Sequence, residues 1–202
     1  MAKQPKPHNY AFIDNQNLNL GVQKMGWKMD WRKFRTFLSD KYGVEKAFMF
    51  IGHMPEHEEM YLKMHELGYL VVLKPTFDMT RVHKPEAALK PNEEPKVEEK
   101  KPVKGNVDAE LVLWAVKEMK QYDKAVIVSG DGDFYSLVEY LASENKLENL
   151  LTPNGHYSNL YNAYERYIDR LDKQRAALAY RVNGRASKPK SSAPSKTNEH
   201  TK

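Results

Sequence analysis

The chain has 202 residues, 41% of them hydrophobic, with a formal net charge of +5 and no cysteine. The absence of cysteine excludes disulfides, thiolate metal sites and a cysteine nucleophile, and the length favours one domain with a single core. No apolar run is long enough to span a membrane, and the N-terminus lacks the apolar segment of a signal peptide, so we expect a cytoplasmic protein with no membrane partner.

The excess positive charge lies near the C-terminus. Residues 183–202 contain five Lys or Arg residues and one Glu, together with several Ser and Pro residues. This composition predicts a basic, disordered tail whose attraction to phosphate groups is non-specific and salt-sensitive. Net charge is therefore a weak argument for a nucleic-acid partner, and the polar residues inside the chain must decide the function.

The first predicted strand ends directly in polar residues. Residues 1–8 predict a flexible N-terminus, and the apolar residues 10–13 predict a short strand. Asp14, Asn15 and Asn17 follow this strand closely. Such residues also serve in ordinary turns, because their side chains bond to nearby backbone groups. One acid and several amides directly after a core strand nevertheless favour a polar site.

Helices and strands alternate along the next part of the chain. The elements expected here are a helix over 31–42 capped by Asp30, a strand over 47–51, a helix over 56–67 closed by Gly68, and a strand over 69–73. Residues 76–104 are rich in Pro, Lys and Glu, which predicts a long, charged, disordered insertion. Because this insertion joins a strand end to the next acidic motif, we expect it to act as a lid or substrate guide.

The alternation continues after the insertion. The elements expected here are a helix from 104 to about 122, a strand over 125–128, a helix from 134 to about 145, a strand over 148–152 and a helix from 157 to about 181. Asp108 shares a helical stripe with Leu111 and Ala115, at the edge of the core-facing side. A carboxylate in this position needs a metal ion or hydrogen-bond donors to offset the cost of its burial.

Two acids follow the strand over 125–128. The sequence Ser129-Gly130-Asp131-Gly132-Asp133 comes directly after it, and its glycines permit a tight turn. We expect Asp133 to cap the following helix. The alternative is a strand, a turn and a capped helix with no ligand, but this alternative leaves Asp131 unexplained.

This pattern predicts an α/β fold, a three-layer sandwich around a parallel sheet of about five strands. Asp14, Asp108, Asp131 and Asp133 would then face one rim, where carboxylates suit a hard divalent cation such as Mg²⁺ or Mn²⁺. No GxGxxG or GxxxxGK[ST] motif is present, so nucleotide binding through these loops has no support. A small-molecule phosphatase also lacks support, because Gln16 stands where a DxDx[TV] motif requires its second Asp.

Three motifs together resemble those of the NYN domain family, LabA-like bacterial type, in the PIN-like nuclease superfamily. They are FIDNQNL at residues 12–18, KGNVDAEL at 104–111 and VSGDGDF at 128–134. Each motif alone is weak, but the three occur in the order and spacing of that family. The resemblance covers roughly residues 9–172 without the insertion, and it implies one PIN-like domain over residues 9–182.

The resemblance implies an Mg²⁺- or Mn²⁺-dependent ribonuclease whose partner is single-stranded RNA. The residues that it implies as metal-binding and catalytic acids are Asp14, Asp108 and Asp131, with Asp133 as a fourth. The residues expected to position the substrate are Asn15, Asn17, Ser129 and Lys104, with Lys74 as a weaker candidate. The expected reaction is in-line hydrolysis that leaves a 5′-phosphate.

One position departs from the family pattern. Bacterial members commonly carry a further Asp six residues after the acid that Asp108 matches, and Trp114 stands there in this chain. Trp114 could pack in the core or an interface, or could form a platform for an RNA base. The rival to the enzyme is a PIN-like RNA-binding or scaffold protein with weak or no cleavage. The sequence also leaves a homodimer open.

Overall fold

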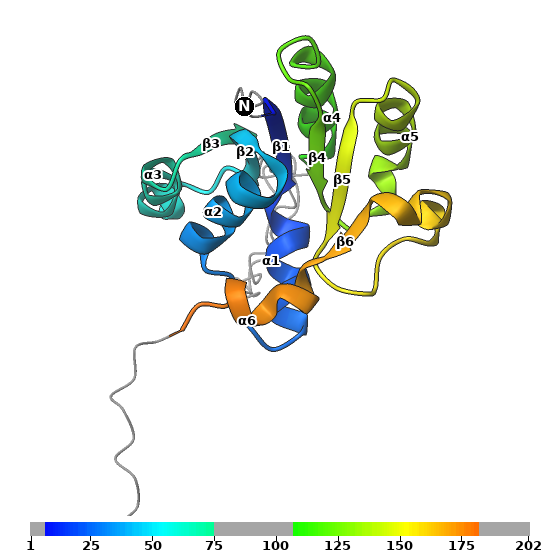
Figure 1. Ribbon diagram of the computed structural model, residues 1–202. Helices are drawn as coiled ribbons and strands as arrows, with labels where there is room; N and C mark the ends of the chain where they lie inside the picture. Colours follow the sequence, from blue (N-terminus) through cyan, green and yellow to red (C-terminus); the bar gives the residue numbers. More distant parts are fainter. Residues whose placement is uncertain (1–6, 75–106, 182–202) are drawn as a thin grey trace, which may run out of the picture.

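The computed structural model describes residues 7–74 and 107–181. Its centre is a sheet of six parallel strands in the order β3-β2-β1-β4-β5-β6 (Figure 1). The strands are β1 (Asn9–Asp14), β2 (Val44–Gly52), β3 (Tyr69–Lys74), β4 (Ala125–Val128), β5 (Leu147–Thr152) and β6 (Ile168–Arg170). The predicted α/β fold around a parallel sheet is confirmed, with one strand more than the five expected.

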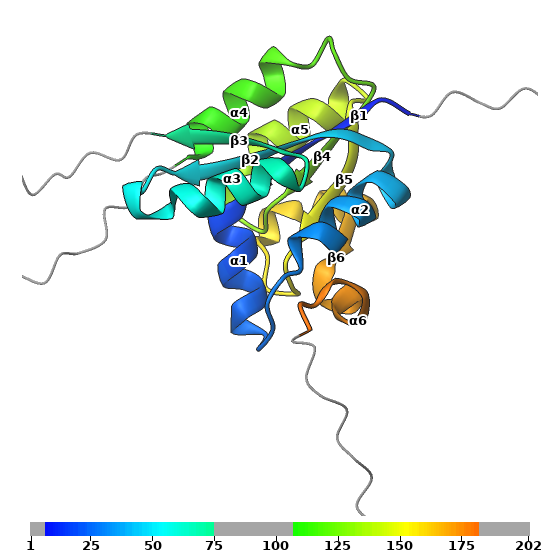
Figure 2. The same ribbon diagram turned by 90° about the vertical axis from the view of Figure 1, so that its left-hand side faces the viewer.

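Helices cover both faces of the sheet (Figure 2). The helices on one face are α1 (Asn15–Lys24), α2 (Trp31–Tyr42), α3 (Glu58–Glu66) and α6 (Arg175–Leu178). The helices on the other face are α4 (Asp108–Lys117) and α5 (Tyr135–Ser143). Short 3-10 helices are η1 (Pro55–His57), η3 (Gly132–Phe134), η4 (Asn159–Tyr167) and η5 (Leu171–Gln174).

The central strand β1 is buried on both of its faces. Ala11 and Ile13 belong to the core under α1, α2 and α3, whereas Tyr10 and Phe12 belong to the core under α4 and α5. Successive side chains of a strand point to opposite faces, so a strand that is apolar throughout must be covered on both sides. The continuous apolar run of β1 is therefore the reason for the three layers.

The strand order reverses beside β1. From β1 the chain moves outward through β2 to β3, and it then crosses back to β4 on the other side of β1. Open parallel sheets bind ligands outside the carboxyl ends of their strands at such a reversal. In this chain the reversal lies between the end of β1, at Asp14, and the end of β4, at Val128.

Several local signals are confirmed at the helix ends. Asp30 Oδ1 accepts a hydrogen bond from Lys33 N at 3.2 Å and caps α2 as predicted. α2 ends at Tyr42, and the next residue is Gly43, which is not part of the prediction; its φ of 63° lies in the left-handed region that glycine adopts without strain. Gly68 closes the region of α3 in the same way, with a φ of 86°.

The sequence predicts a polar site directly after β1 but does not predict the helix α1 that the structure has there. α1 begins directly after Asp14, which caps it by accepting a hydrogen bond from Asn17 N at 3.0 Å. Its buried residues are Leu18 and Val22, which lie four positions apart. Two buried apolar residues in a largely polar sequence give a weak helical pattern, and this is why the sequence does not predict α1.

The prediction of one long helix over 157–181 is wrong. This segment forms η4, β6, η5 and α6, with a break in helical geometry at Tyr164. β6 pairs with β5, and Asn149 Nδ2 donates a hydrogen bond to Tyr167 O at 3.0 Å. Pairing at the sheet edge thus overrides the helical spacing of the aromatic residues.

The helix predicted to run to about Tyr122 is also too long. α4 ends at Lys117, and Tyr122 turns back into the core. The Tyr122 hydroxyl donates a hydrogen bond to Ala115 O at 2.8 Å, which closes this turn against the end of α4.

Part of the sequence-based prediction lies outside the described residues. This part comprises the insertion over 76–104 with Lys104, the tail over 183–202 and the first six residues of the predicted flexible N-terminus. His8, which the sequence groups with that N-terminus, is bound to the domain. Its main-chain N donates a hydrogen bond to Asp123 Oδ2 at 2.9 Å.

Candidate functional site

Asp14 is the one acid among the described residues that is buried, with 5% of its surface exposed. Asp14 Oδ1 accepts a hydrogen bond from Asn17 N at 3.0 Å, and Oδ2 accepts one from Ser129 Oγ at 3.2 Å. Both donors are neutral. Within residues 7–74 and 107–181, Asp14 forms no ion pair, so no basic side chain compensates its charge there.

The loop after β4 is bound to the beginning of α1. Asn17 Oδ1 accepts a hydrogen bond from Gly130 N at 2.9 Å. Asp131 N donates a hydrogen bond to Ser129 Oγ at 3.1 Å, and the same hydroxyl donates to Asp14. One buried hydroxyl therefore connects the two acids, which confirms that the ends of β1 and β4 bring these residues together.

Asp131, and not Asp133 as predicted, caps the helical segment after β4. Asp131 Oδ1 accepts a hydrogen bond from Asp133 N at 3.1 Å, and the segment begins with η3 before α5. Because the turn at Gly132 is tight, Asp133 N reaches the side chain two residues before it, so the cap lies two residues closer to the N-terminus than predicted. The Asp133 side chain is exposed at this edge. The hydroxyl of Tyr161, which is fully buried, donates a hydrogen bond to the main-chain oxygen of Asp131.

Asp108 is the first residue of α4 and is half-buried. Leu111 and Ala115 lie on its helical stripe and are fully buried, as the sequence predicts. The charge of Asp108 is close enough to Asp14 to raise the pKa of the Asp14 carboxyl. The structure thus places Asp108 beside the ends of β1 and β4.

Lys104 and Lys74 are the two lysines that the sequence analysis assigns to the substrate. Lys104 lies outside the described residues. Lys74 Nζ lies 3.0 Å from Glu110 Oε2 as an ion pair, although the two groups are not aligned for a hydrogen bond. Lys74 therefore already has an acidic partner, which weakens its assignment to the RNA backbone.

The pKa of the Asp14 carboxyl is raised above its ordinary value, and burial is the largest cause. Hydrogen bonds from Asn17 and Ser129 lower this pKa, whereas the negative charges of Asp108 and Asp131 raise it further. Loss of hydration therefore outweighs the two hydrogen bonds. A cation bound at this edge would favour the ionised form of Asp14.

The donor chemistry of this edge suits a hard divalent cation. Carboxylate, amide and hydroxyl oxygens are the ligands that Mg²⁺ and Mn²⁺ prefer. Among the described residues, however, no three acidic or histidine side chains are grouped so that they could hold one ion. The residue types fit a divalent ion, whereas the spacing of the described acids does not by itself form a complete ligand set.

Trp114 packs on the sheet below this edge. Its ring centroid lies 5.3 Å from that of Phe48, and Lys117 Nζ lies 4.8 Å from the Trp114 ring centroid. Phe48 pairs with Phe12 in the sheet, two residues before the position of Asp14. These contacts favour the packing role for Trp114 over the role of a platform for RNA at the rim.

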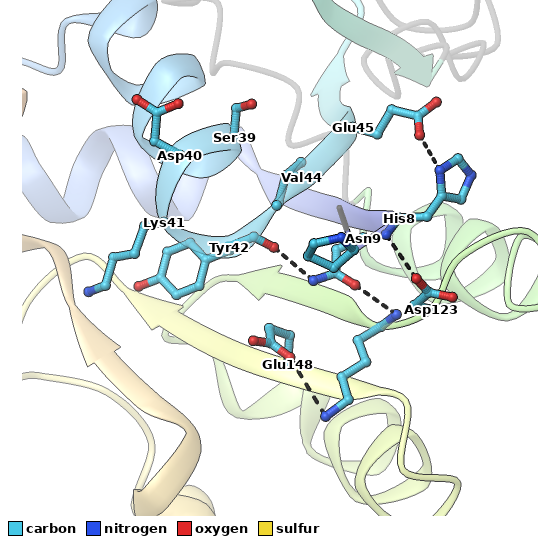
Figure 3. A pocket seen from close by; sticks show the side chains of 13 residues that line it. His8, Asn9, Ser39, Asp40, Lys41, Tyr42, Val44, Glu45, Asp123 and Glu148 are labelled. Atoms are coloured by element: carbon cyan, nitrogen blue, oxygen red, sulfur yellow. Dashed lines mark hydrogen bonds and ion pairs between the residues drawn. The ribbon is translucent and has the colours of Figure 1, made fainter. Parts of the chain in front are cut away.

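A polar pocket lies at the opposite edge of the sheet, at the amino ends of the strands (Figure 3). We call it the amino-end pocket, and its lining residues are Pro7, His8, Asn9, Ser39, Asp40, Lys41, Tyr42, Gly43, Val44, Glu45, Asp123, Lys124 and Glu148. Figure 3 shows that Glu45 contacts the His8 ring and that Asp123 binds the main chain of His8. Lys124, which also lines the pocket, has its Nζ 3.7 Å from Glu148 Oε2. Because these partners satisfy each other, we do not assign a ligand to this pocket.

Comparison with known sequences agrees with the motifs at the carboxyl edge. The sequence profile of the NYN domain matches residues 10–179. This chain belongs to the NYN domain family. Membership places this NYN protein in the PIN-like nuclease superfamily and supports a role related to nuclease activity or RNA.

This NYN protein is similar to the Low amplitude and bright protein LabA of Synechococcus elongatus. The two are 27% identical over 166 residues, which cover 80% of this chain and 82% of LabA. The crystal structure of VPA0982, a protein of unknown function from Vibrio parahaemolyticus, matches with a TM-score of 0.60. That match covers 84% of this chain and 94% of VPA0982 at 18% identity, and it therefore supports the fold alone.

No helix of this NYN protein, within residues 7–74 and 107–181, is long and apolar enough to cross a membrane.

Two residues that support this NYN site are not predicted from the sequence. Buried Asn154 follows β5, and its Nδ2 donates a hydrogen bond to Gly21 O at 2.9 Å. Asn154, like Asn17, is a polar residue shortly after a buried strand, and this signal could have identified it. Tyr161 offers no comparable signal, because its segment has the spacing of a helix.

Proposed function

We propose that this NYN protein is a divalent-metal-dependent ribonuclease that hydrolyses phosphodiester bonds of single-stranded RNA. The observation that carries the proposal is the buried carboxylate of Asp14, which lies beside Asp108 and Asp131 and has a raised pKa. A buried charge without an ionic partner is costly unless a ligand compensates it. Its position at the strand-order reversal is where α/β sheets bind their ligands.

The acids would hold one or two Mg²⁺ or Mn²⁺ ions. Asp14, Asp108 and Asp131 are the first three ligands in this proposal, and the exposed Asp133 is the fourth. A bound divalent ion supplies positive charge that offsets the charge developing on the phosphate, and it favours deprotonation of the attacking water.

The neighbouring neutral groups orient these acids. Asn17 N and Ser129 Oγ donate hydrogen bonds to Asp14 and thereby fix both of its oxygens. In this proposal Asp133 would orient the water for in-line attack, which would leave a 5′-phosphate on the product. Asn15, at the start of α1, and Lys104 are assigned to the RNA backbone, where such contacts position the strand without reading its sequence.

The proposal is tested with labelled single-stranded RNA, with Mn²⁺ or with EDTA. We expect cleavage in Mn²⁺, none in EDTA, and a loss of about 100-fold in the Asp131→Asn variant, the scale of effect seen when a metal site is disturbed. Asp123→Asn is the matched control, because Asp123 also accepts a main-chain hydrogen bond but lies at the amino-end pocket. Its cleavage rate should equal that of the wild type.

Thermal unfolding gives a second measurement. Mn²⁺ should raise the Tm of the wild type and of Asp123→Asn by binding the folded state, and Asp131→Asn should lose most of that rise. Wild-type cleavage rates in the Asp131→Asn variant would remove Asp131 from the catalytic set.

The second candidate function is an RNA-binding or scaffold protein that cleaves RNA weakly or not at all. The spacing of the described acids favours it, as does Trp114 in place of the further acid of the family. RNA binding without Mn²⁺-dependent cleavage by the wild type would support this candidate over the nuclease.

A further inference from the structure

A groove with a volume of about 430 Å³ lies next to the acidic edge. We call it the α1 groove, and the residues that line it are Asn17, Leu20, Gly21, Lys24, Met25, Pro153, Asn154 and His156. One side is α1 and the residue after it, and the other side is the loop between β5 and η4. Asn17 belongs both to this groove and to the hydrogen-bond network of Asp14 and Gly130.

One stripe of α1 faces the groove. Asn17, Gly21 and Lys24 lie four and three residues apart, and such spacing places side chains on the same side of a helix. An α-helix rises about 1.5 Å per residue, so the stripe extends about 10 Å from Asn17 to Lys24. The groove therefore begins at the acidic edge and leads away from it along α1.

The floor of the groove is closely packed. A Cβ atom on Gly21 would lie 2.4 Å from Pro153 Cβ, so only a glycine permits this approach of α1 to the loop. Asn154 Nδ2 donates to Gly21 O at 2.9 Å, and Asn154 Oδ1 accepts from His156 N at 2.7 Å. The two sides of the groove are thus fixed relative to each other.

The chemistry of the α1 groove differs from that of the acidic edge beside it. Its lining contains the cation Lys24 and no acid, and Lys24 forms no ion pair within the described residues. Leu20 is 49% exposed and Met25 is 39% exposed, which is high for large apolar side chains. A ligand that is both anionic and partly apolar matches this combination.

Single-stranded RNA has both properties, because its phosphates are negative and its unstacked bases have apolar faces. We propose that the α1 groove binds the unpaired nucleotides next to the scissile bond, with Leu20 and Met25 contacting a base and Lys24 contacting a phosphate. This inference rests on the proposed ribonuclease function. A duplex keeps its bases stacked, so it cannot present a base face to Leu20 and Met25.

The test is equilibrium binding of a short labelled single-stranded RNA over a series of KCl concentrations. It is measured in EDTA, and again with Mg²⁺ in an Asp131→Asn background, so that the RNA remains intact. Lys24→Gln should weaken binding several-fold and reduce the slope of log K against log salt by about 0.7, the value for one phosphate contact with a single strand. Lys63→Gln is the matched control, since Lys63 is also an exposed lysine in the last turn of a helix, on α3.

The apolar contact is tested with the double variant Leu20→Ser, Met25→Ser. We expect weaker binding of single-stranded RNA with an unchanged salt slope, and no change for duplex RNA. Both side chains are exposed, so the variant should keep its Tm.

The outcomes separate this inference from the function on which it rests. If the wild type binds RNA and Lys24→Gln has the same affinity and salt slope, the α1 groove is not the RNA path, whereas the ribonuclease proposal stands. Equal losses for single-stranded and duplex RNA in the serine variant would overturn the assignment to unpaired bases. If the wild type binds no RNA in either condition, both proposals fail.

Discussion

Acids at the carboxyl edge of the sheet and acids around the amino-end pocket have different partners. Around the amino-end pocket, Lys124 contacts Glu148, and Lys41, which also lines the pocket, contacts Asp169 on β6. At the carboxyl edge, the hydrogen bonds that Asp14 and Asp131 accept from other described residues come from neutral groups, namely main-chain N–H groups and the Ser129 hydroxyl. Glu148 and Asp169 are therefore neutralised by lysines, whereas Asp14 and Asp131 have no basic partner within residues 7–74 and 107–181.

The pKa shifts follow this difference. Partial burial alone would raise the pKa of Asp169, but hydrogen bonds from Lys41 and Tyr42 lower it below its ordinary value. The pKa of Asp14 is raised, because its neutral donors do not offset its burial. Ionised Asp169 therefore stabilises the fold and ionised Asp14 destabilises it. Because a bound cation would offset the destabilisation by ionised Asp14, this region is a candidate for binding a cation. The following substitutions test the contrast between Asp14 and Asp169.

The largest effect is expected for Asp14→Asn. This change should lower Mn²⁺-dependent RNA cleavage about 100-fold and should raise the Tm of the metal-free protein at neutral pH. Because the folded-state pKa of Asp14 is raised, the cost of ionising it is present above that pKa and disappears as the pH falls toward the ordinary value of 3.8. Thermal unfolding in EDTA should show a gain that shrinks on acidification.

A lower Tm for Asp14→Asn at neutral pH would contradict the claim that Asp14 and Asp169 have opposite effects on the fold, since Asp14 would then stabilise the fold as Asp169 does. The amide keeps an oxygen for the bond from Asn17 N, so loss of the helix cap is not expected to obscure the result.

A smaller effect of the opposite sign is expected for Asp169→Asn. The variant should lose about 1 kcal/mol of unfolding free energy at neutral pH, a value that allows for solvent screening of a partly exposed pair. Because the pKa of Asp169 is lowered, its contribution is present above the ordinary value of 3.8 and is lost as the pH falls through the folded-state value. Urea unfolding over a pH series measures this, and RNA cleavage should be unchanged.

Equal urea midpoints for the wild type and Asp169→Asn at neutral pH would show that Lys41 and Tyr42 bind this acid without net stabilisation. Asp169 would then be neutral for the fold, and the contrast would depend on the destabilising effect of Asp14 alone.

The smallest effect is expected for Lys124→Gln. Its Nζ lies 3.7 Å from Glu148 Oε2, and both side chains are about one-third exposed. We expect a loss of about 0.5 kcal/mol or less, which should disappear at high KCl because salt screens exposed charges. Urea unfolding at low and high KCl measures it. A loss that persists in high salt would show that Lys124 stabilises the amino-end pocket by packing and not by charge.

The sequence predicts those parts of the fold that depend on local pattern. β4 is an apolar run without a polar residue, and all four of its side chains are fully buried. Asp30 marks the start of α2 and Gly68 closes the region of α3, because an N-cap and a left-handed residue have strong local preferences. The position of Asp14 and Asp131 together also follows from the sequence, since parallel strands end at the same edge.

Contacts between distant segments set the features that the sequence does not predict. β6 exists because Ile168–Arg170 pairs with β5, and this pairing is not visible in the aromatic spacing of its own segment. Asp131 becomes a cap through the turn at Gly132, where a Cβ atom would lie 2.5 Å from Ser158 Oγ. The spacing of the candidate acids depends on such contacts, and for this reason residue types could be predicted but a complete ligand set could not.

Two asparagines hold β1 at its opposite ends. Asn9 Oδ1 accepts a hydrogen bond from Lys124 N at 3.0 Å, just before β4, and Asn17 Oδ1 accepts one from Gly130 N at 2.9 Å, just after β4. A shift of β1 against β4 by one residue would break both bonds and would turn Asp14 toward the other face of the sheet. The asparagines therefore act as register marks for the two strands that bear the candidate acids. The relative position of the acids along β1 and β4 is therefore fixed before RNA or metal binds. We expect any adjustment on binding to be confined to rotation of their side chains.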